Sequence, residues 1–453
     1  MGNITLRQAA QWCGGQVDPK YADITFLGAN NDTRKLQPGQ LFIVLQGARD
    51  GHDFIPAAME AGAAAVLCSR SVGDYPTIIV EDPRKALGDI AREERRRIGM
   101  KVVGVTGSVG KSTTKEMIAT VLSRKYRVSK TPENHNNDIG MPMAILSMPE
   151  DTQVAVLEMG MNHFREIAYL ASIALPDVAV ITNIGTMHIE HLGSQAGILQ
   201  AKLEIVEGMT PGGKLLFNGD DVLLWNVRRR GDMKVTYFGL ENPECDYRAV
   251  DLQEAPGFQS FRAVTTQGDL AMELALDGLH YVYDAISAVG VGMELGVEPQ
   301  QIRESLADFQ NMQGRQEIFE AKDCTIIKDC YNAGPESMAA ALAVLNKKQG
   351  RRVAVLGDML ELGVCAPAEH YRLGRIVADQ ADVLIAYGPF SSRTVSGALT
   401  GGMPNHLVKG FEDRDAAVAA LKRIVRPGDV LLFKGSRGMR MELILDQFLK
   451  DET

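Results

Sequence analysis

Apolar runs and helical stretches alternate along most of the chain, and this alternation predicts its architecture. The run "KVVGVTG" at 101–107 is followed by similar runs at 154–160, 178–185 and 214–221, with amphipathic stretches between them. Strands that alternate with helices in this way build a parallel sheet with crossover helices. The central part of the chain is therefore expected to form such a sheet.

The two ends of the chain follow patterns of their own. Residues 3–97 mix short strands with an amphipathic helix at 53–63 and a charged helix at 89–99. We interpret the charges of the second helix as a solvated face that precedes a linker. From about 324 the alternation starts again and ends in a helix at 439–450, which is typical of a separate doubly wound domain.

Residues 237–278 interrupt the alternation. This segment is β-rich and irregular, which predicts an antiparallel extension of the central sheet. A helix pair at 283–296 and 299–309 follows it and leads to the second domain boundary. The division predicted for this α/β chain is 1–98, 99–313 and 314–453.

Composition narrows the class of protein. The 453 residues are 45% hydrophobic and 23% charged, and the net charge is -9, which argues against nucleic acid or an anionic membrane as the main partner. No run reaches the roughly 18 apolar residues of a membrane span, and the N-terminus has no signal-peptide core, so we expect a cytoplasmic chain. The six cysteines lack CxxC spacing, so neither a zinc site nor a disulfide framework is expected.

The stretch "VTGSVGKSTTKEM" at 105–117 has the pattern of a phosphate-binding loop between a strand and a helix. Gly107 and Gly110 permit turns that aim backbone N–H groups at phosphate oxygens, Lys111 supplies a positive charge, and Ser112 offers a hydroxyl to Mg²⁺. The strict GxxxxGK[ST] pattern has glycine where this chain has Val105, whereas the shorter TGSxGKS form is complete. The residues expected to bind the phosphates are Thr106, Gly107, Ser108, Val109, Gly110, Lys111, Ser112 and Thr113.

Three residues after later strands could complete this site. Glu158 ends an apolar strand, where a carboxylate is costly unless it meets a cation such as Mg²⁺ or caps the next turn. His188 follows another strand at the edge where open sheets bind ligands, although a packed histidine has the same pattern. Lys202, taken alone, has the pattern of an ordinary surface lysine.

Several separated motifs carry a resemblance over nearly the whole chain. They are "NDTRKLQPGQLF" from 31, "TGSVGKST" from 106, "TPENHNNDIGMP" from 131, "LEMGMNH" from 157, "TNIGTMHIEHLGS" from 182, "AKLEI" from 201, "DCYNAGPESM" from 329, "VLGDMLELG" from 355 and "FKGSRGMRMEL" from 433. In this order they resemble the Mur ligases, the ATP-dependent amide-forming enzymes of peptidoglycan precursor synthesis. Within that family the resemblance is closest to the branch that joins D-Ala-D-Ala to UDP-MurNAc-tripeptide through an acyl phosphate.

The resemblance implies a fold and a set of cofactors. It implies a UDP-sugar-binding domain, a central P-loop ATPase and a Rossmann-like C-terminal domain that closes over ATP and Mg²⁺. Lys111 would contact the β- and γ-phosphates, and Ser112 and Glu158 would hold one Mg²⁺. His188 would help to hold a second Mg²⁺ ion, near a carbamate formed on Lys202. A monomer is expected, with hinges near Gly99 and Gly314.

The resemblance also implies nucleotide and substrate contacts. The further nucleotide contacts are His280 and Asp284 at the adenine, Arg315 at the hinge, and Asp329. The substrate contacts are Thr33, Arg34, Lys35, Asn134, Asn136, Asn137, Tyr331, Asn332, Lys434, Ser436 and Arg437.

The chain departs from the family pattern at two motifs. The usual "HNxxN" of the adenine site is "HYVYD" here, so that Asp284 stands in place of an asparagine. The usual "DDSYNANP" is "KDCYNAGP", with Lys328, Cys330 and Gly334 as the changed positions. A ligase for another D-amino dipeptide, or for one ending in D-lactate or D-serine, is therefore one alternative.

Other readings of the chain stay open at this stage. A Mur-type ligase that adds a single amino acid and a folylpolyglutamate synthase-like enzyme share parts of the pattern. A nucleotide-gated regulatory protein would share the phosphate loop. Such a protein would not need the UDP-sugar segment or Lys202.

Overall fold

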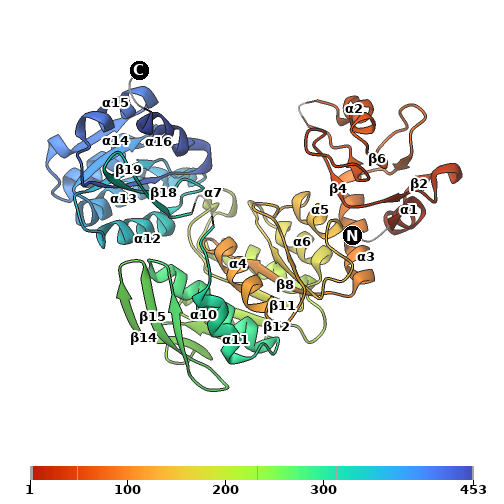
Figure 1. The fold of residues 1–453 in the computed structure, drawn as a ribbon, viewed down its shortest axis with the longest axis horizontal. Helices are drawn as coiled ribbons and strands as arrows, with labels where there is room; N and C mark the ends of the chain where they lie inside the picture. Colours follow the sequence, from red (N-terminus) through yellow and green to blue (C-terminus); the bar gives the residue numbers. More distant parts are fainter. Residues whose placement is uncertain (1–3, 48, 232, 313–314, 451–453) are drawn as a thin grey trace.

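The computed structural model describes residues 4–47, 49–231, 233–312 and 315–450, and these residues form three α/β domains. Figure 1 shows them in a V-shaped arrangement, with the central domain between the N-terminal domain in red and the C-terminal domain in blue. The α/β fold in three parts that the sequence predicts is confirmed.

The N-terminal domain is built around a small sheet. Its elements are β1 (Ile4–Thr5), α1 (Leu6–Cys13), β2 (Gln16–Val17), β3 (Thr25–Phe26), β4 (Ala29–Asn30), β5 (Leu41–Ile43), α2 (Ile55–Glu60), β6 (Ala65–Cys68), β7 (Thr77–Ile79) and α3 (Pro83–Ile98). The strand order is β2-β7-β6-β5-β4, parallel except for β2, while β1 pairs with β3. Helix α1, which the sequence analysis did not predict, begins at a capping box between Thr5 and Gln8.

The central domain holds the largest sheet. Its elements are β8 (Lys101–Thr106), α4 (Lys111–Leu122), β9 (Val128–Lys130), α5 (Gly140–Leu146), β10 (Val154–Glu158), α6 (Glu166–Ala174), β11 (Val178–Ile181), α7 (Ile189–Leu192), α8 (Gln195–Leu203), β12 (Lys214–Asn218), α9 (Val222–Trp225), β13 (Val235–Gly239), β14 (Tyr247–Ala255), β15 (Phe258–Val264), β16 (Leu270–Leu274), α10 (Leu279–Glu294) and α11 (Pro299–Ala307). The order is β16-β15-β14-β13-β12-β11-β8-β10-β9. Strands β8 to β14 are parallel, and β15 and β16 add the predicted antiparallel extension.

The C-terminal domain has its own mostly parallel sheet, which is separate from the other two sheets. Its elements are β17 (Glu317–Ala321), β18 (Cys324–Asp329), α12 (Pro335–Asn346), β19 (Arg352–Gly357), α13 (Ala366–Gln380), β20 (Val383–Tyr387), α14 (Ser391–Thr400), β21 (Val408–Phe411), α15 (Arg414–Ile424), β22 (Val430–Lys434) and α16 (Met441–Leu449). The order is β17-β18-β22-β19-β20-β21, in which β17 alone is antiparallel to its neighbour. This matches the predicted doubly wound domain.

Helix α3 joins the first two domains, and its charged stretch corrects the sequence interpretation. The helix begins where the Asp82 side chain accepts hydrogen bonds from two backbone N–H groups, six residues before the predicted start. Glu94 and Arg95 are buried, so the charges do not form a wholly solvated face. Arg95 donates to Ala174 O (3.0 Å) and to Asp177 Oδ2 (3.0 Å), because the end of α6 supplies acceptors that a charged side chain needs when water is excluded.

The apolar cores divide the chain unequally. One cluster of buried side chains spans the N-terminal and central domains, from Ile4 and Ile90 to Met141, Ile173 and Phe217. In the described part of the chain, the clusters of the C-terminal domain contain no residue of the other two domains.

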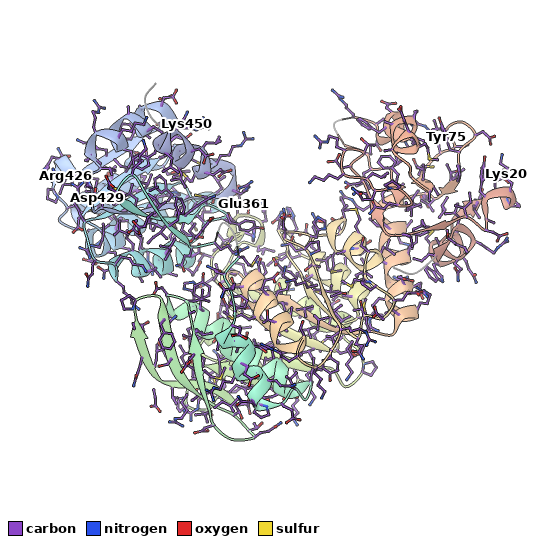
Figure 2. The ribbon with its side chains drawn as sticks, viewed as in Figure 1. Lys20, Tyr75, Glu361, Arg426, Asp429 and Lys450 are labelled. Carbon is purple, nitrogen blue, oxygen red and sulfur yellow. The ribbon has the colours of Figure 1, made fainter. Side chains whose placement is uncertain are left out.

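Polar contacts link the C-terminal domain to the central one. They include the Lys347–Glu254 and Lys348–Asp277 ion pairs at the end of α12. Figure 2 labels Glu361, which lies on the side of the C-terminal domain that faces the central domain.

The predicted hinge residue Gly99 lies between the sheets of the first two domains. Gly99 ends α3 in the left-handed conformation, with φ +73°. Gly314 lies outside the described residues. Across the described residues no helix is long and apolar enough to cross a membrane.

Candidate active site

A cleft of about 610 Å³ lies between the central and C-terminal domains. Both domains place the carboxyl ends of parallel strands at it, which is the edge where open α/β sheets bind ligands. The predicted site residues that line it are Ser108, Val109, Gly110, Lys111, Ser112, Thr113, Asn136, Asn137, Glu158, His188, His280, Asp284, Arg315, Asp329, Tyr331, Asn332 and Lys434.

The phosphate loop connects β8 to α4 and has the shape that its glycines allow. Gly110 has φ +84° and precedes the first residue of α4. A side chain on Gly107 would collide with Thr182, since a Cβ there would lie 1.8 Å from Thr182 Oγ1. Thr106 and Gly107 lie behind the residues that line the cleft. The loop therefore presents its backbone and the start of α4 to the cleft, as a phosphate site requires.

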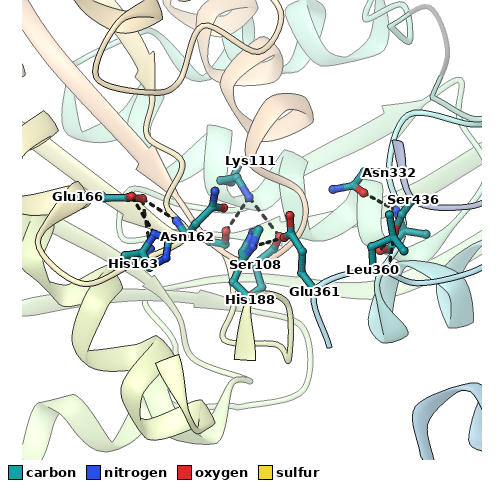
Figure 3. A network of polar contacts seen from close by, with 12 residues as sticks. Ser108, Lys111, Asn162, His163, Glu166, His188, Asn332, Leu360, Glu361 and Ser436 are labelled. Atoms are coloured by element: carbon teal, nitrogen blue, oxygen red, sulfur yellow. Dashed lines mark hydrogen bonds and ion pairs between the residues drawn. The ribbon is translucent and has the colours of Figure 1, made fainter. Parts of the chain in front are cut away.

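Lys111 folds back over this loop. Its Nζ donates to Gly107 O (2.8 Å) and Ser108 O (3.1 Å), as Figure 3 shows. Burial lowers the pKa of Lys111, while the nearby Glu158 carboxylate opposes that shift. An arriving phosphate would replace two neutral carbonyl oxygens with anionic ones and so favour the charged lysine.

Ser112 and Glu158 meet beside the loop and fit a magnesium site. Ser112 Oγ donates to Glu158 Oε2 (2.7 Å), and Asn136 Nδ2 donates to Glu158 Oε1 (2.8 Å). A hydroxyl and one carboxylate next to a phosphate loop are the donor set that Mg²⁺ takes, since it keeps waters and phosphate oxygens as further ligands. Across the described residues there is no group of three or more His, Cys, Asp or Glu that could hold a metal ion.

Glu158→Gln is expected to raise the Mg²⁺ concentration that half-saturates the ATP complex by about 10–100-fold, because the amide keeps the shape but removes the anionic ligand. Titrating Mg²⁺ into the protein bound to a fluorescent ATP analogue measures this half-saturating Mg²⁺ concentration. Glu116→Gln on α4 is the matched control, since Glu116 pairs with Lys115 and does not line the cleft. Equal Mg²⁺ requirements in the two variants would contradict the assignment of Glu158.

Arg315 reaches the phosphate loop from the segment that joins the two domains. Its Nη2 donates to Ser112 Oγ (2.8 Å), and its guanidinium lies 4.1 Å from the centre of the Tyr331 ring. Such stacking holds a planar cation in a fixed orientation. Asp329 in turn accepts from Lys434 Nζ at 2.6 Å. These contacts bring residues of the C-terminal domain to the loop of the central domain.

His188 meets a residue that sequence reasoning missed. Its Nδ1 lies 2.6 Å from Glu361 Oε2, and both residues adopt left-handed backbone conformations with φ 63°. The contact with the His188 side chain lowers the pKa of the Glu361 carboxyl. Glu361 belongs to the C-terminal domain, so no pattern around His188 could have indicated it. Figure 3 shows the contact between His188 and Glu361.

Lys202 is not a surface lysine, which corrects the interpretation from its residue type alone. It lies on α8 with 2% of its surface exposed, and no other described side chain or carbonyl hydrogen-bonds to its Nζ. Burial, with a smaller contribution from the charge of Lys111, lowers its pKa well below the usual value. A buried amine in its neutral form is able to react with CO₂, whereas an ammonium ion is not.

The predicted adenine residues lie on α10. Burial lowers the pKa of His280 to about 4, so this side chain is neutral at physiological pH. Asp284 Oδ1 accepts a hydrogen bond from Thr114 Oγ1 (2.6 Å) beneath the phosphate loop. Their contact with adenine stays a prediction.

The remaining predicted substrate residues lie outside the main cleft. Lys35 lines a second cavity of about 480 Å³ between the N-terminal and central domains, whereas Arg34 pairs with Asp32. Thr33 and Asn134 line neither cavity. Ser436 Oγ accepts from Leu360 N (2.9 Å), which holds the loop after β19 (Figure 3). Arg437 pairs with Glu442.

The structure adds cleft residues that the sequence did not single out. Asn183 lies just after β11 and Asn218 is the last residue of β12, so their place at strand ends was a usable signal. Glu336 near the start of α12 accepts from Thr186 N at 3.0 Å. No sequence signal pointed to Glu336, because its partner belongs to another domain.

Known proteins resemble this chain over nearly its whole length. Three family descriptions match: "Mur ligase family, catalytic domain" over residues 23–95, "Mur ligase middle domain" over 105–292, and "Mur ligase, glutamate ligase domain" over 314–437. The UDP-N-acetylmuramoyl-tripeptide--D-alanyl-D-alanine ligase of Bacillus subtilis (strain 168) is 38% identical over 98% of both chains. The Escherichia coli (strain K12) protein with the same name is 36% identical over 100% of both chains.

Solved structures show the same similarity over the full length of the chain. A crystal structure of MurF from Acinetobacter baumannii superimposes with a TM-score of 0.92 at 31% identity over 100% of both chains. The MurF ligase of Thermotoga maritima in complex with ADP has a TM-score of 0.81 at 29% identity, covering 93% of this chain and 96% of that one. Motifs, fold, cleft and full-length similarity thus lead to one conclusion: the chain belongs to the Mur ligase family.

Proposed function

We propose that this protein is an ATP-dependent ligase that joins D-Ala-D-Ala to UDP-MurNAc-tripeptide and releases ADP and phosphate. The observation that carries the proposal is full-length similarity to D-alanyl-D-alanine ligases together with a cleft in which the phosphate loop faces residues of the C-terminal domain. An amide does not form from a free carboxylate in water, so the carboxylate must first be activated. ATP supplies that activation.

The reaction follows from the groups in the cleft. The tripeptide carboxylate attacks the γ-phosphorus of ATP, and ADP leaves as an acyl phosphate forms. The amine of D-Ala-D-Ala then attacks the acyl carbon, and phosphate departs with the bonding electrons as the amine loses its proton. Lys111 and Arg315 lie where they can offset the charge of the transferred phosphoryl group.

The remaining groups position the reactants. Ser112 and Glu158 would hold Mg²⁺, which would neutralise phosphate charge during transfer. A carbamate on Lys202 would turn a buried amine into an anion that could help His188 to hold a second metal ion. The low pKa of Lys202 supports formation of the carbamate. Residues from two domains line the cleft, so domain closure would exclude water from the acyl phosphate.

The departures from the family pattern do not favour a different amine. Lys328 lies on β18, 3.7 Å from Glu317 on the neighbouring strand, and Cys330 is buried with its Sγ directed to Phe433 O. Gly334 packs against Met187. None of the three is among the residues that line the cleft in the described chain. D-Ala-D-Ala is therefore the amine that we propose.

Phosphate release by the purified protein, with ATP, Mg²⁺ and each substrate omitted in turn, tests the function. Release is expected to require both UDP-MurNAc-tripeptide and D-Ala-D-Ala, and the product is expected to gain the dipeptide residue mass in a mass spectrum. Turnover without the dipeptide, or a product of unchanged mass, would contradict the proposal. Other amines, including D-Ala-D-Ser, serve as controls for the amine site.

We further infer the division 1–98, 99–313 and 314–453, which agrees with the sheets on either side of each joint. One copy of the chain brings the residues of the cleft together, which supports a monomer. A cytoplasmic location fits the use of ATP.

A further inference from the structure

The carboxyl group of Asp284 is placed where an ionised carboxylate would oppose the nucleotide. Asp284 lines the cleft, and only 5% of its surface is exposed. Its Oδ1 lies so close to the phosphate loop that a Cβ on Gly110 would be 2.9 Å away. Because the loop is built to receive anions, a negative charge at this point would repel them.

The two oxygens of Asp284 have unequal surroundings. Oδ1 accepts the hydroxyl hydrogen of Thr114 at 2.6 Å. Oδ2 is buried and has no hydrogen-bond partner in the protein. A buried polar atom without a partner is costly, and this one lies in the wall of a ligand cleft.

The neighbouring groups leave the carboxyl without a close ion pair. Helix α4, which packs against α10, contributes the Thr114 hydroxyl, and Arg315 is the cation whose charge acts on the carboxyl. Tyr281, on the same helix, is a neutral phenol because burial raises its pKa. Tyr283 donates to an aspartate after β12 instead. Strands β12 to β14, as described, bring no charged group that shifts the pKa of Asp284, and burial raises that pKa to about 7.

We propose that Asp284 binds the nucleotide as a neutral carboxylic acid: Oδ1 accepts from Thr114, and Oδ2 carries a proton that it donates to an acceptor atom of the nucleotide. No covalent bond changes in this step. When the nucleotide enters, an ionised Asp284 takes up one proton from solvent. The inference rests on the proposed function only in that the cleft binds a nucleotide.

The pH dependence follows from the direction of the pKa shift. Below about pH 7 the free protein already carries the proton, so binding pays no protonation cost. Above about pH 7, the Kd of the nucleotide rises by up to about tenfold for each pH unit. This rise ends at the pKa that Asp284 has in the nucleotide complex. Asparagine at this position offers the same donor and acceptor without a proton to lose. D284N is therefore the informative variant.

The experiment measures the Kd of ADP by calorimetry for the wild type and D284N between pH 7.5 and 9.0, where the phosphates of ADP stay ionised. The ratio of the wild-type Kd to the D284N Kd is expected to rise about tenfold per pH unit at first. A ratio that stays constant would overturn the inference. A protein that binds no ADP at any pH would overturn the proposed function as well, so the two failures are distinguishable.

Two further arms sharpen the test. T114V removes the hydrogen bond that favours the ionised form, so the midpoint of the wild-type pH profile is expected to move to higher pH. A midpoint that does not rise would contradict Asp284 as the titrating group. Measuring the same ratio of wild-type Kd to D284N Kd with inorganic pyrophosphate identifies the atom that accepts the hydrogen bond from Asp284. If the ratio again rises with pH, the acceptor is a phosphate oxygen. If it rises only with ADP, the acceptor belongs to the nucleoside.

Discussion

Lys111→Met is expected to lower the kcat of amide formation by about 10³-fold, which is the effect of losing one charge-stabilising donor in a buried site. Lys111 already lies over the phosphate loop, where its Nζ has only neutral carbonyl partners. Its charge is thus available for the transferred phosphoryl group. Steady-state phosphate release with both substrates measures the loss.

The stability of the same variant separates a functional role from a structural one. Burial lowers the pKa of Lys111 in the folded protein, so its protonated form opposes folding at all pH values below the pKa of the unfolded chain. Methionine removes that cost, and the unfolding temperature is expected not to fall. Lys125→Met is the control that is expected to keep full activity, because Lys125 lies three residues beyond the end of α4 and its Nζ donates to Gly296 O, away from the cleft. If Lys111→Met retains more than about a tenth of the wild-type kcat, the assignment is wrong.

Lys202→Ala is expected to lower kcat by about 10²-fold, because the carbamate proposed on Lys202, an anion that would help to hold a metal ion, could not form. Lys202→Arg should be equally impaired, since a guanidinium keeps the positive charge but forms no carbamate. Added acetate or formate is expected to restore part of the activity of Lys202→Ala by supplying a carboxylate to the cavity. The measurement is phosphate release with and without the added acid.

Depletion of CO₂ supplies an independent readout for the wild type. Carbamate formation joins the neutral amine to CO₂ and releases one proton, so activity should fall in CO₂-free buffer at low enzyme concentration and return with bicarbonate. The low pKa of Lys202 makes the neutral amine available at neutral pH. Full activity of Lys202→Arg would contradict the carbamate.

The sequence predicts the parts of the site that depend on local order. Lys111 and Ser112 follow a strand and open a helix, and Glu158 ends the next strand of the sheet, so their meeting follows from parallel topology alone. Local sequence pattern also predicts the antiparallel strands β15 and β16 and the separate C-terminal sheet. In each case the pattern of apolar and polar residues is complete within a short segment.

The sequence does not predict contacts that arise only when distant segments pack. Arg95 is buried because α6, some eighty residues later, brings carbonyl oxygens to it. The burial of Lys202 likewise depends on neighbours that a pattern of residue types does not reveal. Glu336 lines the cleft and Glu361 contacts His188, both from the C-terminal domain, so their roles depend on how the domains are placed.

The unequal division of the apolar core determines how the chain comes apart. The N-terminal and central domains share one buried cluster, so exposing either removes apolar contacts from the other, and the two lose structure cooperatively. The buried apolar clusters of the C-terminal domain include no described residue of the other two domains, and the exposed ion pairs that join it to the central domain can be replaced by water at little cost. The three domains therefore unfold as two cooperative units. Separating the C-terminal domain from the other two costs less free energy than separating the N-terminal and central domains, and it is this separation that opens the active-site cleft.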